Sequence, residues 1–257
     1  MNILKYALKR LMPPIMWDAA ARFRIRSQKT YNTWESAAAS AGAYDDDLVN
    51  RFRVERTEIN RKSGRIVPLE GNALSWITAL LPAGNLSVTD FGGATGEYGE
   101  ALQRLRSDID YTVVENPTLV ALCASNHSIR FTTKIPSECD VFFTSSTLQY
   151  LKDPYGALAV GFQSAKRVVL LVRNNFSERE TFQVQRSPLF DNGGGDIPAG
   201  FTNRTITYPL RTISESRVNS IAADKGFKMI ARILENSEVL TREDNVYGAQ
   251  LVFLRSN

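Results

Sequence analysis

Hydrophobic and polar positions along the chain predict strands that alternate with helices from about residue 86 onwards. Runs rich in β-branched and aromatic residues end at Asp90, Val114 and Thr144, and each is followed by a segment with helical spacing. A further run, Val168–Val172, is wholly apolar, which is typical of a parallel strand buried on both faces. Alternation of this kind predicts a doubly wound α/β sheet with helices on both faces.

The pattern of apolar and polar positions differs before residue 86 and again after residue 173. Residues 1–81 are predicted to be mostly helical, and residues 174–207 are predicted to be long and irregular. A helix is expected over residues 214–225. Two final apolar runs, 227–233 and 249–254, are expected to pair in antiparallel fashion. The order of elements therefore favours one seven-stranded sheet that follows a helical extension.

The N-terminal segment is amphipathic and basic. Over residues 3–11 the apolar side chains fall on one helical face, with Lys5, Lys9 and Arg10 opposite, and Pro13 ends the helix. Such a helix can rest on an anionic membrane surface or pack against protein. Its moderate apolar stripe favours the protein contact, and a peripheral membrane contact is the second interpretation.

Composition narrows the classes of protein. The 257 residues are 43% hydrophobic and carry a formal net charge of +4, which permits an anionic partner without requiring one. The basic residues follow no nucleic-acid-binding pattern, so nucleic acid is not expected as a partner. Cys123 and Cys139 have neither metal nor disulfide spacing, and no apolar run is long enough to cross a bilayer. We expect a cytoplasmic protein without a metal, and a peripheral contact of the N-terminal helix with the inner face of the membrane is the second interpretation.

A glycine-rich segment follows the first predicted strand. It reads Asp90-Phe91-Gly92-Gly93-Ala94-Thr95-Gly96 and opens into a helical pattern. Glycines let the backbone come close to a ligand, and the start of a helix offers unpaired N–H groups. A dinucleotide loop would need a glycine where Phe91 stands. The segment therefore predicts a loop for another cofactor, with an ordinary strand–helix turn as the alternative.

Polar side chains also end two other predicted strands. Glu115 and Asn116 close the second strand, at about the 20-residue offset at which an acid accepts ribose hydroxyls. Ser145 and Ser146 close the fourth strand, beside the point where strand order reverses and ligands bind in such sheets. The predicted cofactor-binding residues are Asp90, Gly92, Gly93, Gly96, Glu115, Asn116, Ser145, Ser146 and Gln149.

The glycine-rich segment resembles motif I of class I S-adenosylmethionine (SAM) dependent methyltransferases, with Ala94 in place of the usual middle glycine. A narrower resemblance rests on further motifs along most of the chain. They are Leu11-Met12-Pro13-Pro14, Trp34-Glu35-x-Ala37, Gly42-x-Tyr44-Asp45, Val114-Glu115-Asn116-Pro117, Ser145-Ser146-x-Leu148-Gln149-Tyr150 and Tyr208-Pro209. Together they are similar to a family of methyltransferases found among bacterial lipopolysaccharide, O-antigen and exopolysaccharide synthesis genes.

This resemblance implies a fold, a cofactor and a reaction. The fold is a Rossmann-like, seven-stranded class I methyltransferase sheet with helices on both faces and an antiparallel last strand over residues 86–257. A helical N-terminal extension over residues 1–85 precedes it. The cofactor is SAM, with Asp90 near its amino-acid end, and the acceptor is a small molecule or glycan, such as a sugar or nucleotide-sugar. Two alternatives stay open. One is a noncatalytic SAM- or nucleotide-binding module that recruits a membrane-associated glycan synthesis complex, and the other is an NAD-dependent sugar-modifying enzyme.

No spacing in the sequence specifies a catalytic base. Glu97 and Tyr150 follow the cofactor strands and are the candidates, whereas His127 precedes the third strand and should lie at the far edge of the sheet. Substrate contacts are predicted in the N-terminal part and in the late irregular segment. They are Tyr44, Asp45, Arg204, Tyr208 and Arg211. Arginine forks suit phosphate or carboxylate, although an ordinary surface position explains each of these residues equally well.

Overall fold

The computed structural model describes residues 29–42, 46–69, 72–125, 128–235 and 246–256. The predicted amphipathic helix over residues 3–11 lies outside these ranges, as do Tyr44, Asp45 and His127. Within them, no helix has the length and the apolar character needed to cross a membrane.

The larger of two described sheets has seven strands. They are β2 (Leu86–Phe91), β3 (Ile109–Val114), β4 (Arg130–Thr132), β5 (Cys139–Ser145), β6 (Ala165–Phe176), β9 (Phe227–Glu235) and β10 (Tyr247–Arg255). Their order in the sheet is β4-β3-β2-β5-β6-β10-β9. Strands β2 to β6 pair in parallel, whereas β10 is antiparallel to both of its neighbours. The predicted seven-stranded sheet with an antiparallel last strand is confirmed.

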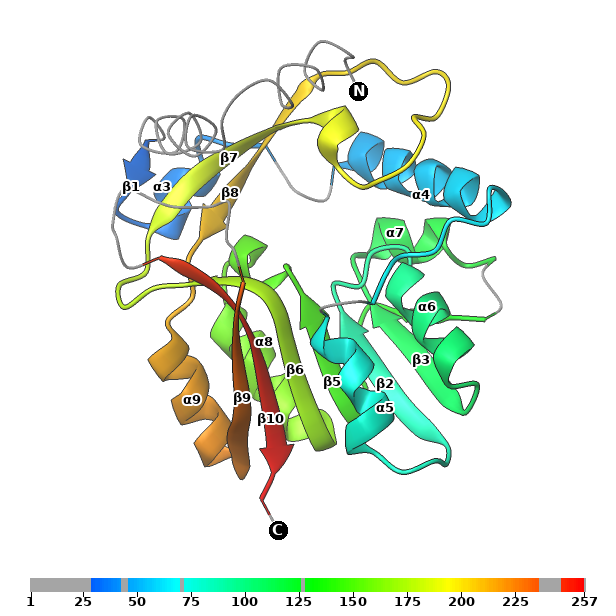
Figure 1. The fold of residues 1–257 in the computed structure, drawn as a ribbon. Coiled ribbons are helices and arrows are strands. Elements are labelled where there is room, and N and C mark those ends of the chain that lie inside the picture. The colour runs from blue at the N-terminus through cyan, green and yellow to red at the C-terminus, as the bar shows by residue number, and fades with distance from the viewer. Residues whose placement is uncertain (1–28, 43–45, 70–71, 126–127, 236–245, 257) are drawn as a thin grey trace, which may run out of the picture.

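Helices cover both faces of this sheet (Figure 1). The 3-10 turn η1 (Ala73–Trp76) with α5 (Ile77–Leu80) and α6 (Glu97–Leu105) packs on one face, and α8 (Pro154–Ser164) with α9 (Glu215–Asp224) packs on the other. Helix α7 (Pro117–Leu122) connects β3 to β4. Strand β6 explains the two layers, because successive side chains of a strand point to opposite faces. Leu170 and Val172 join one core, and Val169 and Leu171 join the other.

A second, three-stranded sheet lies across the carboxyl ends of the first, and it corrects the sequence prediction. Residues 174–207, predicted to be irregular, contain β7 (Phe182–Pro188), η3 (Leu189–Asp191) and the start of β8 (Thr205–Arg211). Strand β7 pairs with β8 and also with β1 (Thr30–Tyr31), so the N-terminal part is not wholly helical. The pattern failed because β7 (FQVQRSP) has few apolar residues, and its stability depends on strands distant in the sequence.

Two helices complete this layer, α3 (Trp34–Ala38) and α4 (Asp47–Lys62). We call β1, α3, α4, β7, η3 and β8 the cap. Asp46 accepts hydrogen bonds from the first backbone N–H groups of α4, as expected of a helix-capping acid. Val49 and Phe52 of α4 then form a small core with Leu189, which holds η3 against the helix. The cap thus combines two segments that are distant in the sequence, residues 30–62 and 182–211, above the sheet (Figure 1).

Candidate functional site

A cavity of about 1090 Å³ lies between the cap and the carboxyl ends of the central strands. Its floor is the turn after β2, and its walls include residues of α4, β7 and β8. The chain runs from β2 to β3 and β4 on one side and from β5 to β6 on the other, so the cavity sits where the strand order reverses. Open α/β sheets bind ligands at this place.

Most of the predicted cofactor residues line this cavity. They are Asp90, Gly92, Gly93, Glu115, Asn116, Ser145 and Ser146. Gly96 and Gln149 do not belong to the lining. Gly96 is the N-cap of α6, where its φ of +81° suits a glycine, and the Gln149 amide donates to the Ser146 hydroxyl at 3.0 Å.

Asp90 is fully buried at the end of β2. One carboxylate oxygen accepts a hydrogen bond from the Tyr111 hydroxyl at 2.8 Å, and the other has no partner among the described residues. Burial raises the pKa of Asp90 to about 7, against the hydrogen bond from Tyr111 and with a contribution from nearby Glu115. The cavity floor therefore holds a buried carboxyl group with a raised pKa and with one oxygen that lacks a hydrogen-bond donor among the described residues.

The protein's own side chains explain why glycines follow Asp90. A Cβ on Gly93 would lie 2.2 Å from an Asp90 carboxylate oxygen. A Cβ on Gly92 would lie 2.2 Å from the Thr147 hydroxyl, and Gly92 also has a positive φ of +75°. The glycines allow β2 and β5 to end close together while the turn stays open toward the cavity.

Backbone strain concentrates around the same cavity. In the described part of the chain, the residues other than glycine with positive φ are Ala94 (50°), Ser146 (57°) and Arg173 (56°). Ala94 and Ser146 follow the ends of β2 and β5, Arg173 interrupts β6 next to the end of β5, and all three line the cavity. Left-handed backbone is uncommon for such residues and clusters at functional sites.

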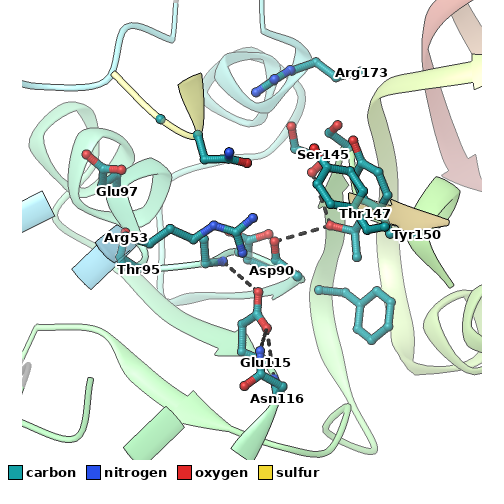
Figure 2. Close-up of a pocket in the computed structure, with 18 of the residues that line it drawn as sticks. Arg53, Asp90, Thr95, Glu97, Glu115, Asn116, Ser145, Thr147, Tyr150 and Arg173 are labelled. Carbon is teal, nitrogen blue, oxygen red and sulfur yellow. Dashed lines mark hydrogen bonds between the residues drawn. The ribbon is translucent and has the colours of Figure 1, made fainter. Parts of the chain in front are cut away.

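Glu115 connects β3 to the glycine turn (Figure 2). One of its oxygens accepts from the Ala94 backbone N–H at 3.2 Å. The other accepts from the Asn116 backbone N–H at 2.9 Å and from the Asn116 side-chain amide at 3.1 Å. A carboxylate has about four acceptor positions, so these three bonds fix the side chain and leave capacity for a ligand hydroxyl, mainly at the oxygen that accepts from Ala94. The predicted proximity of the second strand's acid to the turn is observed.

Helix α4 contributes cavity residues that the sequence analysis missed, namely Arg53, Arg56, Thr57 and Asn60. The Thr57 and Thr95 hydroxyls are hydrogen-bonded at 2.9 Å, which docks the helix on the glycine turn. Figure 2 shows Arg53 extending across this turn. A signal was present, because Arg56, Thr57 and Asn60 continue the helical spacing of Val49 and Phe52 and form one buried stripe with them.

The cap side of the cavity is aromatic and polar. The Tyr150 and Tyr208 rings meet edge to face at 5.3 Å, and the Tyr150 hydroxyl donates to the Gln185 side chain at 3.3 Å. Glu97 and Arg173 also line the cavity. Both predicted catalytic candidates and one predicted substrate residue, Tyr208, are therefore at this site.

Two predicted substrate arginines lie elsewhere. Arg204 is exposed and pairs with Asp46 at 3.5 Å, and Arg211 is buried in an ion pair with Glu180. Neither lines the cavity. Within the described ranges, no group of three His, Cys, Asp or Glu side chains is placed to hold a metal. Both cysteines are buried free thiols.

No family model matches the sequence, and no curated protein does. Solved structures resemble the chain at low identity. The [4+2]-cyclase SpnF gives a TM-score of 0.51 at 12% identity, over 81% of this chain and 94% of that one. The CcbJ methyltransferase from Streptomyces caelestis gives 0.49 at 13% identity, over 76% and 92%. Magnesium protoporphyrin IX methyltransferase from Synechocystis PCC 6803, solved with bound SAM, gives 0.47 at 13% identity, over 80% and 84%.

These likenesses concern the fold. The strand order, the antiparallel β10 and the helices on both faces are those of the class I SAM-dependent methyltransferase fold. The chain has this fold. One of the similar structures is named as a cyclase, so function has to be argued from the site rather than from the architecture.

Proposed function

We propose that the cavity binds SAM and that the protein transfers its methyl group to a small-molecule or glycan acceptor. The observation that carries this proposal is the pair of carboxylates on either side of the glycine turn. Asp90 offers an unpartnered oxygen on the cavity floor, and Glu115 is fixed beside the turn with acceptor capacity to spare. These two groups suit the ammonium end and the ribose hydroxyls of SAM.

Two buried polar atoms without a partner, at the ends of β2 and β5, favour a ligand that brings hydrogen-bond donors to this part of the cavity. Buried polar atoms without a partner are rare in folded proteins. The Ser145 hydroxyl at the end of β5 is such an atom, as is the second Asp90 oxygen, and both residues line the cavity. A cationic amino-acid group satisfies both. The pyrophosphate of NAD would bring negative charge to the same carboxylate, which disfavours the NAD alternative.

Bound SAM supplies a methyl group activated by its sulfonium. The chain's contribution is then alignment and exclusion of water, and alignment alone lowers reaction barriers by about 7–11 kcal/mol in favourable cases. The cap forms one wall of the cavity above the ends of β2 and β5, which suits that task. Glu97 and Tyr150 are the candidates to accept a proton from an oxygen nucleophile, because both line the cavity.

The acceptor that we propose is a sugar or nucleotide-sugar of surface polysaccharide synthesis. A cavity of about 1090 Å³ accommodates a nucleoside cofactor together with a second ligand. We also propose that the basic N-terminal segment brings the protein to anionic membranes. Deletion of residues 1–14 should then abolish flotation with vesicles that contain anionic lipid, and unchanged flotation would exclude this contact.

The cofactor assignment is tested by calorimetry with SAM, S-adenosylhomocysteine (SAH) and NAD. We expect SAM and SAH to bind, and Asp90→Asn and Glu115→Gln each to weaken SAM binding at least tenfold. Arg204→Gln serves as the matched control, because Arg204 lies outside the cavity, and it should bind SAM as the wild type does. Tighter binding of NAD than of SAM would overturn the assignment.

Turnover separates an enzyme from the noncatalytic binding module. The protein with SAM is incubated with sugars, sugar phosphates and nucleotide-sugars, and SAH release is measured. Methylated product that disappears in the Glu115→Gln variant supports the transferase. Tight SAM binding without turnover on any of these acceptors would favour the binding module.

A further inference from the structure

We infer that the acceptor is a sugar with an anionic group, a phosphate or a carboxylate, and that Arg173 binds this group. The inference rests on the proposed function of the cavity and extends it. Neither the glycine turn nor the two carboxylates of the floor require a charged acceptor. The inference comes instead from Arg173, which directly follows Val172, the last residue of β6 that pairs with β5.

The position of Arg173 aims it at the reaction site. Val172 pairs with Ser145, so Arg173 stands next to the end of β5, where the unpartnered Ser145 hydroxyl meets the cavity. Its φ of 56° breaks the extended backbone of β6 at this point. Figure 2 shows Arg173 on the side of the cavity opposite Glu115. A ligand that lies between them has its ribose end at Glu115 and its other end toward Arg173.

Internal contacts leave most of the Arg173 guanidinium available. The Arg173 Nη1 donates a long hydrogen bond, 3.5 Å, to the Tyr98 hydroxyl. Among the described residues, no carboxylate lies within 4.0 Å of its nitrogens, although Glu235 is near enough to help raise its pKa. Burial raises the pKa of Glu235, against the effects of Gln250 and of Arg173 nearby. Arg173 therefore lines the cavity, and its guanidinium has several donors to spare.

Other arginines of this region are already committed to the fold. Arg56 donates to the backbone oxygens of Phe190 and Gly195 at 2.8 Å and 2.7 Å, and Arg211 is paired with Glu180. Arg53 lies across the glycine turn, on the side of the proposed cofactor. Arg173 is therefore the cation best placed for the acceptor, and a guanidinium fork matches phosphate or carboxylate in a bidentate way.

The groups near Arg173 suit a sugar ring. Tyr150 is close enough to contribute to the raised pKa of Arg173, and it contacts Tyr208 and Gln185. Ser187, which lies on β7 as Gln185 does, lines the cavity as well. Aromatic faces cover the C–H surface of a sugar, while amide and hydroxyl groups bond its hydroxyls. A neutral sugar would take water away from the Arg173 cation without supplying a counter-charge. This cost of desolvation disfavours a neutral acceptor.

The test is calorimetry on the full chain, with and without saturating SAH. The probes are glucose 1-phosphate, UDP-glucose, glucuronic acid and glucose. We expect at least one anionic probe to bind at least tenfold more tightly than glucose. Arg173→Gln should remove that difference while leaving SAH affinity within twofold, and Arg204→Gln, an exposed arginine outside the cavity, should change neither. The melting temperature of each variant confirms that it is folded.

The outcomes separate the two proposals. Glucose 1-phosphate against glucuronic acid distinguishes a phosphate from a carboxylate as the preferred anion. Anionic and neutral probes that bind alike, no binding of any probe at millimolar concentration, or unchanged anion binding in Arg173→Gln would each overturn the inference. SAH binding without anion binding leaves the proposed function standing alone. The protein could also fail to bind SAH and still bind anions in a way that depends on Arg173. That result would support the anion site and contradict the cofactor assignment.

Discussion

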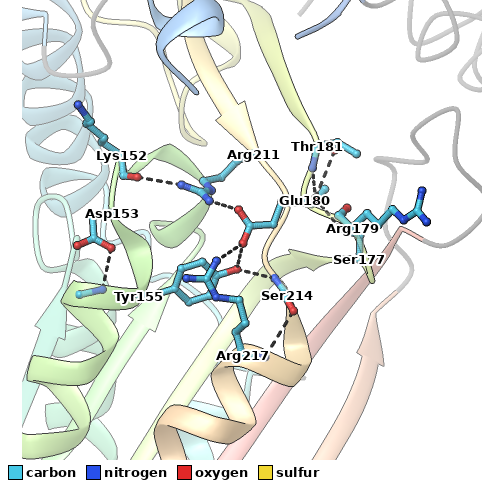
Figure 3. Close-up of polar contacts among 12 residues, drawn as sticks. Lys152, Asp153, Tyr155, Ser177, Arg179, Glu180, Thr181, Arg211, Ser214 and Arg217 are labelled. Atoms are coloured by element: carbon cyan, nitrogen blue, oxygen red, sulfur yellow. Dashed lines mark hydrogen bonds and ion pairs between the residues drawn. The ribbon is translucent and has the colours of Figure 1, made fainter. Parts of the chain in front are cut away.

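Glu180 and Arg211 form a buried ion pair that joins the two connections between the cap and the central sheet (Figure 3). Glu180 lies between β6 and β7, and Arg211 ends β8 just before the chain returns to the sheet. Arg211 also donates to the Lys152 backbone oxygen at 2.9 Å, and Glu180 accepts from Tyr155. Arg211, predicted as a substrate contact, thus holds the cap in place over the cavity.

Breaking this pair should loosen the cap. The side chains are 17% and 8% exposed, so Glu180→Gln would leave the Arg211 cation buried without its counter-charge. We expect a loss of about 3 kcal/mol in the free energy of unfolding, measured by urea denaturation. Arg217→Gln is the matched control, because Arg217 also pairs with Glu180 but is 58% exposed, and it should cost less than about 1 kcal/mol. Equal effects of the two substitutions would contradict the structural role of the buried pair.

The pKa of Asp90 predicts how stability without ligand depends on pH. Because burial raises this pKa from 3.8 to about 7, the folded protein keeps a proton that the unfolded chain releases between these values. The contribution of Asp90 to stability is therefore greatest below pH 4, falls as the pH rises, and is lost above pH 7. Asp90→Asn should flatten this dependence and melt at a higher temperature than the wild type at pH 8.

The same substitution should weaken SAM binding, so stability and binding change in opposite directions. Thermal melting from pH 5 to pH 9, with and without SAM, measures both effects. An Asn side chain can still accept the Tyr111 hydroxyl bond, which makes it a conservative probe of the charge. A variant with the same slope of melting temperature against pH as the wild type would show that Asp90 does not titrate in this range.

The glycine turn offers two substitutions with opposite expected results. Gly93→Ala places a Cβ 2.2 Å from an Asp90 oxygen and should reduce SAM affinity more than tenfold. Ala94→Gly relieves a residue with a φ of 50° and should stabilise the fold by about 1 kcal/mol while SAM binding persists. Calorimetry and urea denaturation measure the two quantities. Loss of binding in Ala94→Gly would show that the Ala94 methyl group itself contacts the cofactor.

Arg56 should control the loop that follows η3. Its guanidinium donates to the backbone oxygens of Phe190, Asn192 and Gly195, and the Asn60 amide donates to Gly194. We expect Arg56→Gln to speed proteolysis within residues 191–196 and to lower stability by about 2 kcal/mol, because bonds from a charged donor are lost. Arg51→Gln, an exposed position on the same helix, is the control and should change neither property. Cleavage at the wild-type rate in Arg56→Gln would show that other contacts hold the loop.

Local patterns account for the features that the sequence predicted well. The central strands β2, β3, β5 and β6 are each marked by an apolar run, and Asp90, Glu115 and Ser145 lie at the ends of three of them. In a parallel sheet these ends meet at one edge, so three separate local signals predict one site. The cap strands lacked such signals. Thr30 pairs with Gln183, a contact across most of the chain between segments with little apolar patterning.

The sequence did not predict which arginines line the cavity. Arg204, Arg211 and Arg173 all occur in or near strand ends, and composition cannot tell which faces the cavity. The sequence by itself determined the doubly wound sheet and the carboxylates at its edge, because strand periodicity and turn chemistry are local. Tertiary structure alone decided that Arg211 pairs with Glu180 whereas Arg173 lines the cavity. That choice depends on contacts between distant segments and on one left-handed residue, which no local pattern encodes.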